Sequence, residues 1–278
     1  MSRQLLLWAS ALLLGTSAPA YAQAPPHVHG SDSDADAGVP FHQAHPMDPS
    51  PPTPTGKMLS LPLAGGASAV AYVAQPKQAA SGGILVVHEY WGLNDFVKGQ
   101  ADALAAKGYL ALAVDLYQGK VATQAEEAGK LMQGLDAAYA ASVEKAGIAW
   151  LKQHLHGKKI ATLGWCMGGG QSLLASLGSP QEVAATVMYY GLPVTDVAQL
   201  KTLRGPVLGI WATKDGWITP AKVEAFDKAL TEAGVKHSFH SFDADHAFAN
   251  PTGGRYNPPA AAEANALTDK FLAAALKG

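Results

Sequence analysis

The chain has 278 residues, of which 48% are hydrophobic and 15% charged, and its formal net charge is −2 at pH 7. Lysines and arginines are scattered and form no basic stripe, so nothing indicates a nucleic-acid partner. A single cysteine excludes an intrachain disulfide.

The first 22 residues have the pattern of a secretory signal peptide. Arg3 supplies a positive start, residues 5–14 a short apolar core, and Ala20-Tyr21-Ala22 a small-x-small cleavage site. The apolar run is shorter than the roughly 20 residues that a membrane-spanning helix needs, so we expect cleavage rather than anchoring. The mature protein is therefore expected to be periplasmic or secreted, with no membrane contact after cleavage.

Residues 23–56 are rich in Pro, His, Asp and Ser and poor in apolar side chains, which predicts a flexible linker. Four histidines in it could bind a metal weakly, but no cysteine accompanies them and prolines interrupt any rigid frame. We therefore predict no metal site among them (His27, His29, His42 and His45). Residues 57–278 are long enough for one domain with a sizeable core.

Strand-like and helix-like segments alternate along this domain. Two short strands are predicted within 58–73, around Ala64-Gly65-Gly66, and six further strands at 83–88, 109–114, 160–164, 186–190, 207–212 and 237–242. Helices are predicted at 96–107, 168–177, 220–233 and 260–276, and two more within 123–154, separated near Gly134 or Ala141. The apolar runs are typical of strands covered on both faces. This order predicts an α/β fold, with a mostly parallel central sheet and helices on both faces.

The only cysteine, Cys166, lies between a predicted strand and a predicted helix, in Gly164-Trp-Cys-Met-Gly-Gly-Gly170. Glycines two residues before and two after it are what a sharp strand–nucleophile–helix turn needs, because larger side chains would collide there. A buried, inert cysteine is the alternative. The glycine frame favours a nucleophile.

Two further groups follow strands in the order acid, then histidine: Asp215 and His246. In such sheets functional residues gather beyond the carboxyl ends of the strands. His246 would act as the base for the thiol, and Asp215 would orient the imidazole. Asp215 could instead cap the next helix, and other acids and histidines compete for these roles (Asp196, Asp243, Asp245, His88 and His240).

The segment after the strand at 83–88 is His88-Glu-Tyr-Trp-Gly-Leu-Asn94. α/β-Hydrolases place at this point the loop that donates one backbone amide to an oxyanion hole, and the other donor would be the amide of Met167. Glu89 is unexpected there, because a carboxylate would repel a developing oxyanion unless it has a partner of its own. A surface salt bridge is the alternative for Glu89.

At these residues the chain resembles the dienelactone hydrolase (carboxymethylenebutenolidase) family of α/β-hydrolases, over roughly residues 59–276. The resemblance rests on the two segments above, on Asp115-Leu-Tyr117, Tyr189-Tyr-Gly191 and Lys214-Asp215, and on Asp245-His-Ala-Phe-Ala-Asn-Pro251 with Arg255-Tyr-Asn-Pro258. It implies Cys166, His246 and Asp215 as a catalytic triad. It also implies that Glu89 pairs with the resting thiol and accepts its proton, and that the backbone of Tyr90 is the second oxyanion donor.

Family members that act on dienelactone hold its carboxylate with two arginines. The corresponding positions here are Gln118 and Asn250, and Arg255 is a possible substitute. Loss of both arginines would weaken binding of anionic substrates, which makes dienelactone doubtful as the natural substrate. The resemblance places four residues at the substrate: Trp91, Tyr117, Gln118 and Asn250.

The sequence thus predicts a cysteine-dependent hydrolase of small-molecule esters or lactones that works through a thioester and needs no cofactor. A thiol-based redox-responsive protein on the same fold, without hydrolytic turnover, is the alternative. A binding protein on an inactive scaffold is a third reading, against which the complete set of four reactive residues argues.

Overall fold

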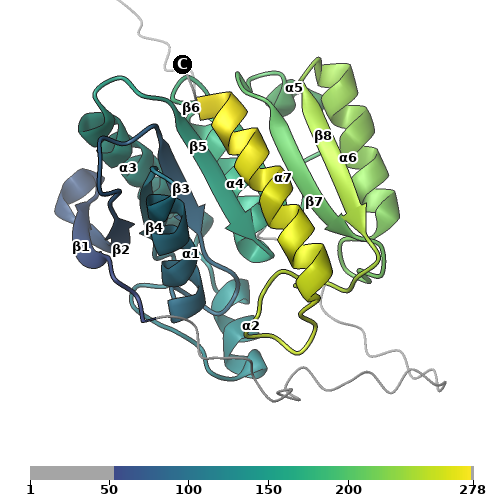
Figure 1. Ribbon diagram of the computed structural model, residues 1–278, viewed down its shortest axis with the longest axis horizontal. Coiled ribbons are helices and arrows are strands. Elements are labelled where there is room, and N and C mark those ends of the chain that lie inside the picture. The colour runs from purple at the N-terminus through teal and green to yellow at the C-terminus, as the bar shows by residue number, and fades with distance from the viewer. Residues whose placement is uncertain (1–52, 277–278) are drawn as a thin grey trace, which may run out of the picture. The chain divides into compact units, whose positions relative to one another are not determined.

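The computed structural model describes residues 53–276 (Figure 1). The predicted signal peptide and nearly all of the predicted linker, with its four histidines, lie outside these residues. None of the helices in the described range is long and apolar enough to cross a membrane.

Eight strands of the described chain form one sheet, in the order β1-β2-β4-β3-β5-β6-β7-β8. β2 runs antiparallel to both of its neighbours, and every pair from β4 to β8 is parallel. The mostly parallel sheet is therefore as predicted. The strands are β1 (Lys57–Pro62), β2 (Ser68–Ala74), β3 (Gly83–Val87), β4 (Leu110–Val114), β5 (Ile160–Trp165), β6 (Val183–Tyr189), β7 (Val207–Ala212) and β8 (His237–Phe242).

The helices also follow the prediction closely. They are α1 (Asp95–Ala106), α2 (Ala125–Gln133), α3 (Ala137–Leu155), α4 (Met167–Gly178), α5 (Val197–Leu200), α6 (Pro220–Ala233) and α7 (Pro258–Leu276), with a 3₁₀ turn η2 at Ala64–Gly66. The break within 123–154 falls at Gly134, and α3 begins after Asp136, whose carboxylate accepts the amides of Ala138 and Tyr139. The sequence does not predict α5, because four residues are too few to show a helical period.

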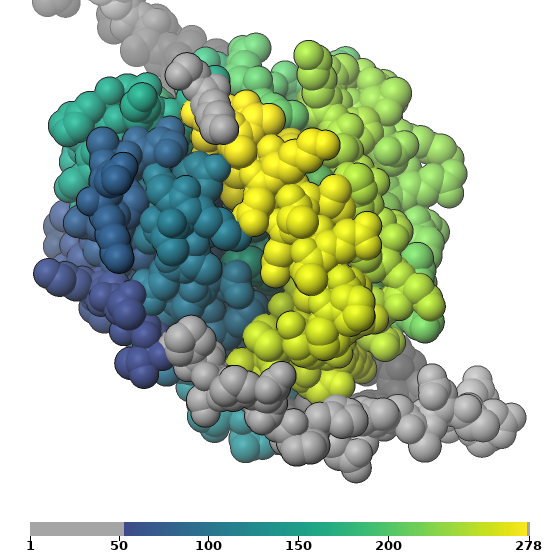
Figure 2. Space-filling view, viewed as in Figure 1, coloured from purple at the N-terminus to yellow at the C-terminus, as the bar shows by residue number. Residues whose placement is uncertain are grey.

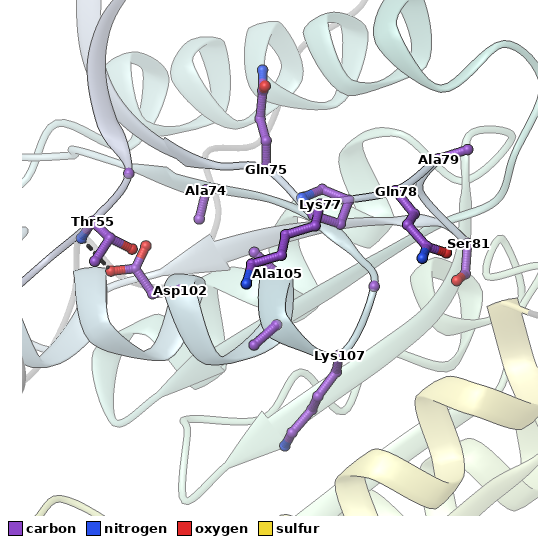
Figure 3. Close-up of a pocket in the computed structure, with 14 residues that line it drawn as sticks. Thr55, Ala74, Gln75, Lys77, Gln78, Ala79, Ser81, Asp102, Ala105 and Lys107 are labelled. Atoms are coloured by element: carbon purple, nitrogen blue, oxygen red, sulfur yellow. Dashed lines mark hydrogen bonds between the residues drawn. The ribbon is translucent and has the colours of Figure 1, made fainter.

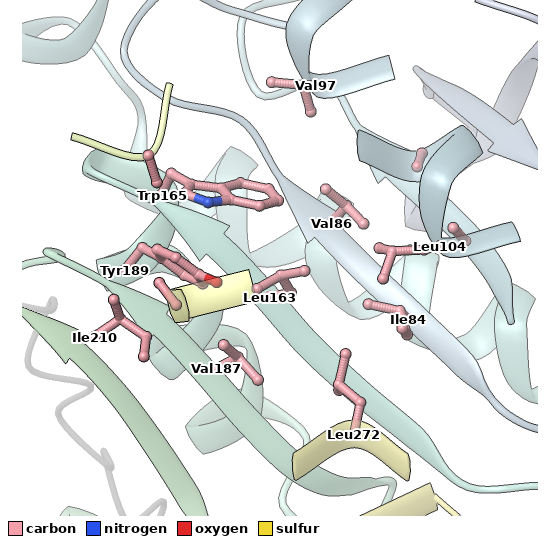
Figure 4. Packing of buried hydrophobic residues seen from close by; sticks show 14 of the residues in the cluster. Ile84, Val86, Val97, Leu104, Leu163, Trp165, Val187, Tyr189, Ile210 and Leu272 are labelled. Atoms are coloured by element: carbon pink, nitrogen blue, oxygen red, sulfur yellow. The ribbon is translucent and has the colours of Figure 1, made fainter. Parts of the chain in front are cut away.

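The two faces of the sheet bury different hydrophobic clusters. Beneath α1 and α7 lies a cluster that includes Ile84, Val86, Leu163, Val187 and Ile210 (Figure 4). In the space-filling view, α7 lies in yellow across this face (Figure 2). The opposite face packs against α4 and α6, through residues such as Leu173, Met188, Trp211 and Phe226. Helices on both faces therefore leave the ends of the strands as the places where loops can form a site.

Close contact between β5 and α4 fixes the turn that joins them. A Cβ at Gly164 would collide with the backbone of Gly168, and one at Gly168 would collide with the carbonyl groups of Val87 and His88. The first turn of α4 therefore lies directly against the loop that follows β3. This packing requires glycine at both positions, for the steric reason that the sequence pattern suggested.

Candidate active site

Cys166 occupies a strained turn at the carboxyl end of β5. Its φ and ψ are 54° and −122°, a backbone conformation that residues other than glycine rarely adopt. The amide of Cys166 donates to the carbonyl of Tyr189 at 3.0 Å, and its carbonyl accepts the amide of Gly169 at 3.0 Å. The thiol is thus fixed at the start of α4, in a side chain that is only 5% exposed.

The structure brings the thiol, an imidazole and a carboxylate from three separate loops into one hydrogen-bonded chain. The Sγ atom of Cys166 lies 3.1 Å from Nε2 of His246, and Nδ1 of His246 lies 2.6 Å from Oδ2 of Asp215. The other oxygen of Asp215 accepts the amides of Trp217 and Ile218, both at 2.8 Å. Asp215 therefore receives three hydrogen bonds, which fix its orientation toward the imidazole.

The surroundings of Asp215 and His246 favour the charged form of each. Burial disfavours ionisation of Asp215, but the hydrogen bond and charge of His246, with the two loop amides, lower the pKa of Asp215 overall. Burial likewise opposes a charged His246, yet the neighbouring Cys166 and Asp215 raise the pKa of His246 to about 10. An imidazolium that donates to sulfur is the arrangement in which a thiolate acts as nucleophile.

Glu89 lies in the same site, but in different surroundings. Its side chain is 2% exposed, and Oε2 accepts the side-chain amide of Asn250 at 2.5 Å. The Oε1 atom has no hydrogen-bond partner within the described residues. Burial raises the pKa of Glu89 to about 7, against the opposing effects of Asn250 and His246. The hydrogen bond of the Cys166 sulfur goes to His246, so pairing of the resting thiol with Glu89 stays a prediction.

Asn250 has hydrogen-bond partners within the protein. The sequence places it at the substrate, but its side chain is buried and both ends of its amide already bind within the protein. The nitrogen donates to Glu89, and the oxygen accepts the amide and hydroxyl of Thr252 at 2.9 and 2.7 Å. These contacts direct the amide of Asn250 toward Glu89 and Thr252, and a contact of Asn250 with substrate stays a prediction.

The other predicted residues lie on the loops after β3 and β4. Tyr90 and Trp91 are half-buried, with ring centroids 4.6 Å apart. Tyr117 is buried, and its hydroxyl lies 3.1 Å from the sulfur of Met167, the first residue of α4. Gln118 is exposed and has a φ of 55°. The segment Val87–His88, two residues before Tyr90, packs closely against Gly168 in the first turn of α4.

The competing acids and histidines have other places. Asp196 caps α5, Asp243 pairs with Lys214 on the surface, and Asp245 is exposed. His240 is half-buried within β8. His88 is fully buried and bonds to backbone groups on both sides of its ring. None of the acids replaces Asp215 as the partner of His246.

Two aromatic residues next to His246 were assigned no role from the sequence. Tyr190, at the end of β6, is fully buried, and its ring centroid lies 5.0 Å from that of His246. Trp217, on the loop after β7, is 42% exposed, and its ring centroid lies 5.5 Å from that of His246. Position just past a strand end was the available signal for Tyr190, and proximity to Asp215 was the signal for Trp217.

A cavity of about 540 Å³ lies at the opposite, amino-terminal end of β3 and β4 (Figure 3). Its lining includes Lys77, Asp102 and Lys107, and none of the predicted site residues. Asp102 is already bound to Tyr72, and Lys107 to Asp269. The cavity is therefore unconnected with the chemistry around Cys166. No group of three or more possible metal ligands occurs within residues 53–276.

The strand order, the antiparallel second strand and the strained turn at Cys166 define an α/β-hydrolase fold. The model of the dienelactone hydrolase family matches residues 69–276, and the chain belongs to this family, as its sequence motifs predicted. Membership supports hydrolysis of lactones or esters as the activity of the chain.

Individual proteins are similar to this chain over most of its domain. The "Protein usf" of Aquifex pyrophilus is 31% identical over 211 residues, which cover 72% of this chain and 91% of that protein. A carboxymethylenebutenolidase homolog of Xenopus tropicalis is 29% identical over 165 residues, 58% of this chain and 66% of its own. The crystal structure of dienelactone hydrolase from Anabaena variabilis shares the fold, with a TM-score of 0.61 and 23% identity over 81% of this chain and 99% of that one.

Proposed function

We propose that this protein hydrolyses neutral carboxylic esters or lactones by covalent catalysis, with Cys166 as the nucleophile. The observation that carries the proposal is the continuous chain from sulfur through imidazole to carboxylate, built on a strained turn that points the thiol at the base. Nucleophile, base and orienting acid at hydrogen-bond distance are the arrangement that activates a nucleophile in acyl transfer.

In the first half of the proposed reaction, the proton of Cys166 passes to the carboxylate of Glu89, and the sulfur, beside the imidazolium of His246, attacks the carbonyl carbon of the substrate. The amides of Tyr90 and Met167 would stabilise the resulting oxyanion. The tetrahedral intermediate then breaks its carbon–oxygen bond, and the imidazolium of His246 protonates the leaving alkoxide. The products of this half are an alcohol, or the opened end of a lactone, and a thioester on Cys166.

In the second half, His246 takes a proton from water and the hydroxide attacks the thioester. The same two amides hold the second oxyanion, and its collapse releases the carboxylic acid and the thiolate of Cys166, to which Glu89 returns the proton. Asp215 stays ionised throughout, since its lowered pKa favours the charged form beside an imidazolium. Every proton required in the cycle is thus supplied by the thiol, the imidazole or water.

The preference for neutral substrates rests on the two positions where the family holds a carboxylate. Gln118 is exposed and uncharged, and Asn250 is buried behind Glu89. A substrate carboxylate would therefore find no bidentate arginine at either position, and the ionised form of Glu89 would repel it. Trp217, next to His246, offers an apolar surface instead.

The decisive experiment compares the wild type with Cys166→Ala and Cys166→Ser on matched neutral and anionic esters and lactones. We expect the alanine variant to lose turnover, and mass spectrometry of the wild type to trap an acyl group on Cys166 during turnover of an activated aryl ester. Normal activity of Cys166→Ala would overturn the mechanism. A clear preference for the anionic member of each pair would overturn the substrate class, and Arg255→Gln would then test whether that arginine binds the carboxylate.

The same mass spectra address the redox alternative. Reversible oxidation of Cys166, with no acyl group trapped from any ester, would favour a redox-responsive protein. The burial of the thiol and its hydrogen bond to His246 favour acyl transfer. We further propose export to the periplasm or beyond, which cell fractionation and N-terminal sequencing of the mature protein would test.

A further inference from the structure

His88 is a fully buried histidine that the mechanism above does not use. Its Nε2 atom receives the backbone amide of Leu116 at 3.1 Å, and its Nδ1 atom lies 2.6 Å from the carbonyl oxygen of Glu89. An amide can only donate and a carbonyl can only accept. Nε2 must therefore be the unprotonated nitrogen, and Nδ1 must carry the proton and donate it to the carbonyl of Glu89.

The surroundings agree with this neutral tautomer. Burial lowers the pKa of His88, in spite of the carbonyl of Glu89 and the charge of Asp115. The nearest oxygen of Asp115 lies 4.0 Å from Nε2, farther away than the Leu116 amide, and it accepts the amide of Tyr117 at 2.8 Å. His88 is therefore a fixed donor–acceptor link between the loops after β3 and β4, and not a second base.

The carbonyl that His88 holds belongs to the peptide group whose nitrogen is that of Tyr90. A second donor, the amide of Gly92, lies 3.2 Å from the same oxygen. In a planar trans peptide the N–H points away from the C=O, so a carbonyl fixed from two sides also fixes the direction of the Tyr90 N–H. This loop packs against Gly168 in the first turn of α4, beside Cys166 and Met167.

We propose that His88 is a positioning residue, which locks the Glu89–Tyr90 peptide so that the Tyr90 amide is aimed at the oxyanion formed during attack by Cys166. This inference rests on the proposed function. His88 touches neither the substrate nor the sulfur in this scheme. It supplies the preorganisation that makes a backbone donor effective, because a donor that must first rotate into place contributes little to the transition state.

The test compares His88→Leu with His88→Gln. Leucine fills similar space without hydrogen bonds, whereas the amide of glutamine again has one donor and one acceptor. We expect kcat of His88→Leu to fall by about 10- to 100-fold, less than or equal to the loss of a whole oxyanion donor, with little change in KM. Glutamine should recover most of the lost kcat. The matched control, His240→Leu, changes a histidine on β8 and should keep wild-type kinetics.

A second readout separates positioning from general damage to the fold. Alkylation of Cys166 by iodoacetamide forms no oxyanion, so its rate should stay within about twofold in His88→Leu, whereas a trifluoromethyl ketone, which forms an oxyanion adduct with the thiol, should bind at least tenfold more weakly. An equal fall in alkylation rate, an unchanged kcat, or no recovery with glutamine would each overturn the proposal.

Should the leucine variant fail to fold, the wild type still decides the matter. In protein labelled with [¹⁵N]tyrosine, the Tyr90 amide proton should shift downfield when the trifluoromethyl ketone adduct forms, and should shift likewise in His88→Gln. No shift in a wild type that forms the adduct would refute the role of His88 and leave the nucleophile intact. A failure of Cys166 to form any acyl or ketone adduct would refute the proposed function itself.

Discussion

The loop after β7 and the loop after β3 each bring one buried carboxylate to the site, Asp215 and Glu89. Asp215 receives hydrogen bonds from two backbone amides and from His246, and its pKa is lowered. Glu89 receives one hydrogen bond, from Asn250, and burial raises its pKa to about 7. The hydrogen bonds and the charge of His246 outweigh burial at Asp215, whereas burial outweighs the single donor and the charge of His246 at Glu89.

Two acids whose pKa values differ in this way can take different roles in one site. A carboxylate that stays ionised can orient an imidazole and stabilise its positive charge, whereas one that titrates near neutral pH can gain and lose a proton during a reaction cycle. The comparison therefore assigns Asp215 a permanent charge and Glu89 a transferable proton. The following substitutions test each half of that assignment.

Asp215→Asn should have the largest effect. The uncharged amide does not stabilise a positive imidazole as a carboxylate does. Its NH2 group can also present a donor, instead of an acceptor, to Nδ1 of His246. We expect kcat for an activated ester to fall by about 10³-fold or more, with the fold retained by circular dichroism. Asp243→Asn is the matched control, since Asp243 pairs with Lys214 on the surface and should be dispensable. Comparable losses in both variants would refute the special role of Asp215.

Glu89→Gln should have a smaller but more specific effect. In our assignment the ionised carboxylate accepts a proton from Cys166, so wild-type kcat/KM should fall as the pH is lowered through about 7, the pKa of Glu89. Glutamine cannot accept that proton. We expect an activity loss of about 10- to 100-fold at pH 8 and disappearance of this step from the pH profile. A glutamine variant that keeps the step would show that another group causes it.

Asn250→Ala should move the same step without abolishing it. The hydrogen bond from Asn250 favours the ionised form of Glu89, so its loss should raise the pKa of Glu89 further. The acidic limb of the pH profile should then shift to higher pH, with a loss of only a few-fold at pH 9 or above. An altered KM for anionic substrates with an unshifted limb would instead support the substrate-binding role that the sequence predicts for Asn250.

Asn250 also shows where prediction from the sequence ended. The alternation of apolar runs and helical periods predicted the order of strands and helices, because each buried strand and each amphipathic helix carries its own pattern. The glycines around Cys166 predicted the turn for the same local reason. Asn250 donates to Glu89, which lies 161 residues away in the chain. No comparable sequence pattern predicts which buried group an amide will contact over such a separation.

The contacts within the site likewise could not be predicted from the sequence. The motifs predicted that Cys166, Asp215 and His246 belong together, yet which rival acid would reach His246 depended on the packing of the loops after β7 and β8. His88 was considered only as a rival of His246, and Tyr190 was named only within a family motif. The contact of Tyr190 with His246 and that of His88 with the Leu116 amide follow from parallel strands ending side by side, which only the assembled sheet provides.

A third buried carboxylate, Glu144 on α3, lies outside the site and can be compared with Asp215 and Glu89. Its side chain is 2% exposed, its Oε1 atom has no hydrogen-bond partner within the described residues, and burial raises its pKa well above the ordinary value. Because the folded state binds the proton more tightly than the unfolded state, the free energy of unfolding should decrease as the pH rises above about 4.5, the ordinary pKa of a glutamate, toward the raised value.

Glu144→Gln removes this ionisation and keeps the size of the side chain. We expect the variant to gain about 1 kcal/mol of unfolding free energy over the wild type at pH 8, and to match it near pH 4, as measured by urea denaturation. The control, Glu182→Gln, removes a carboxylate that pairs with Lys152 at the surface and should change stability by less than about 0.5 kcal/mol. Unlike Glu89→Gln, Glu144→Gln should leave the pH profile of catalysis unchanged, because burial without access to the sulfur changes stability but not the reaction. A shift of the catalytic step near pH 7 in Glu144→Gln would mean that the raised pKa of Glu89 is not the property that the site uses.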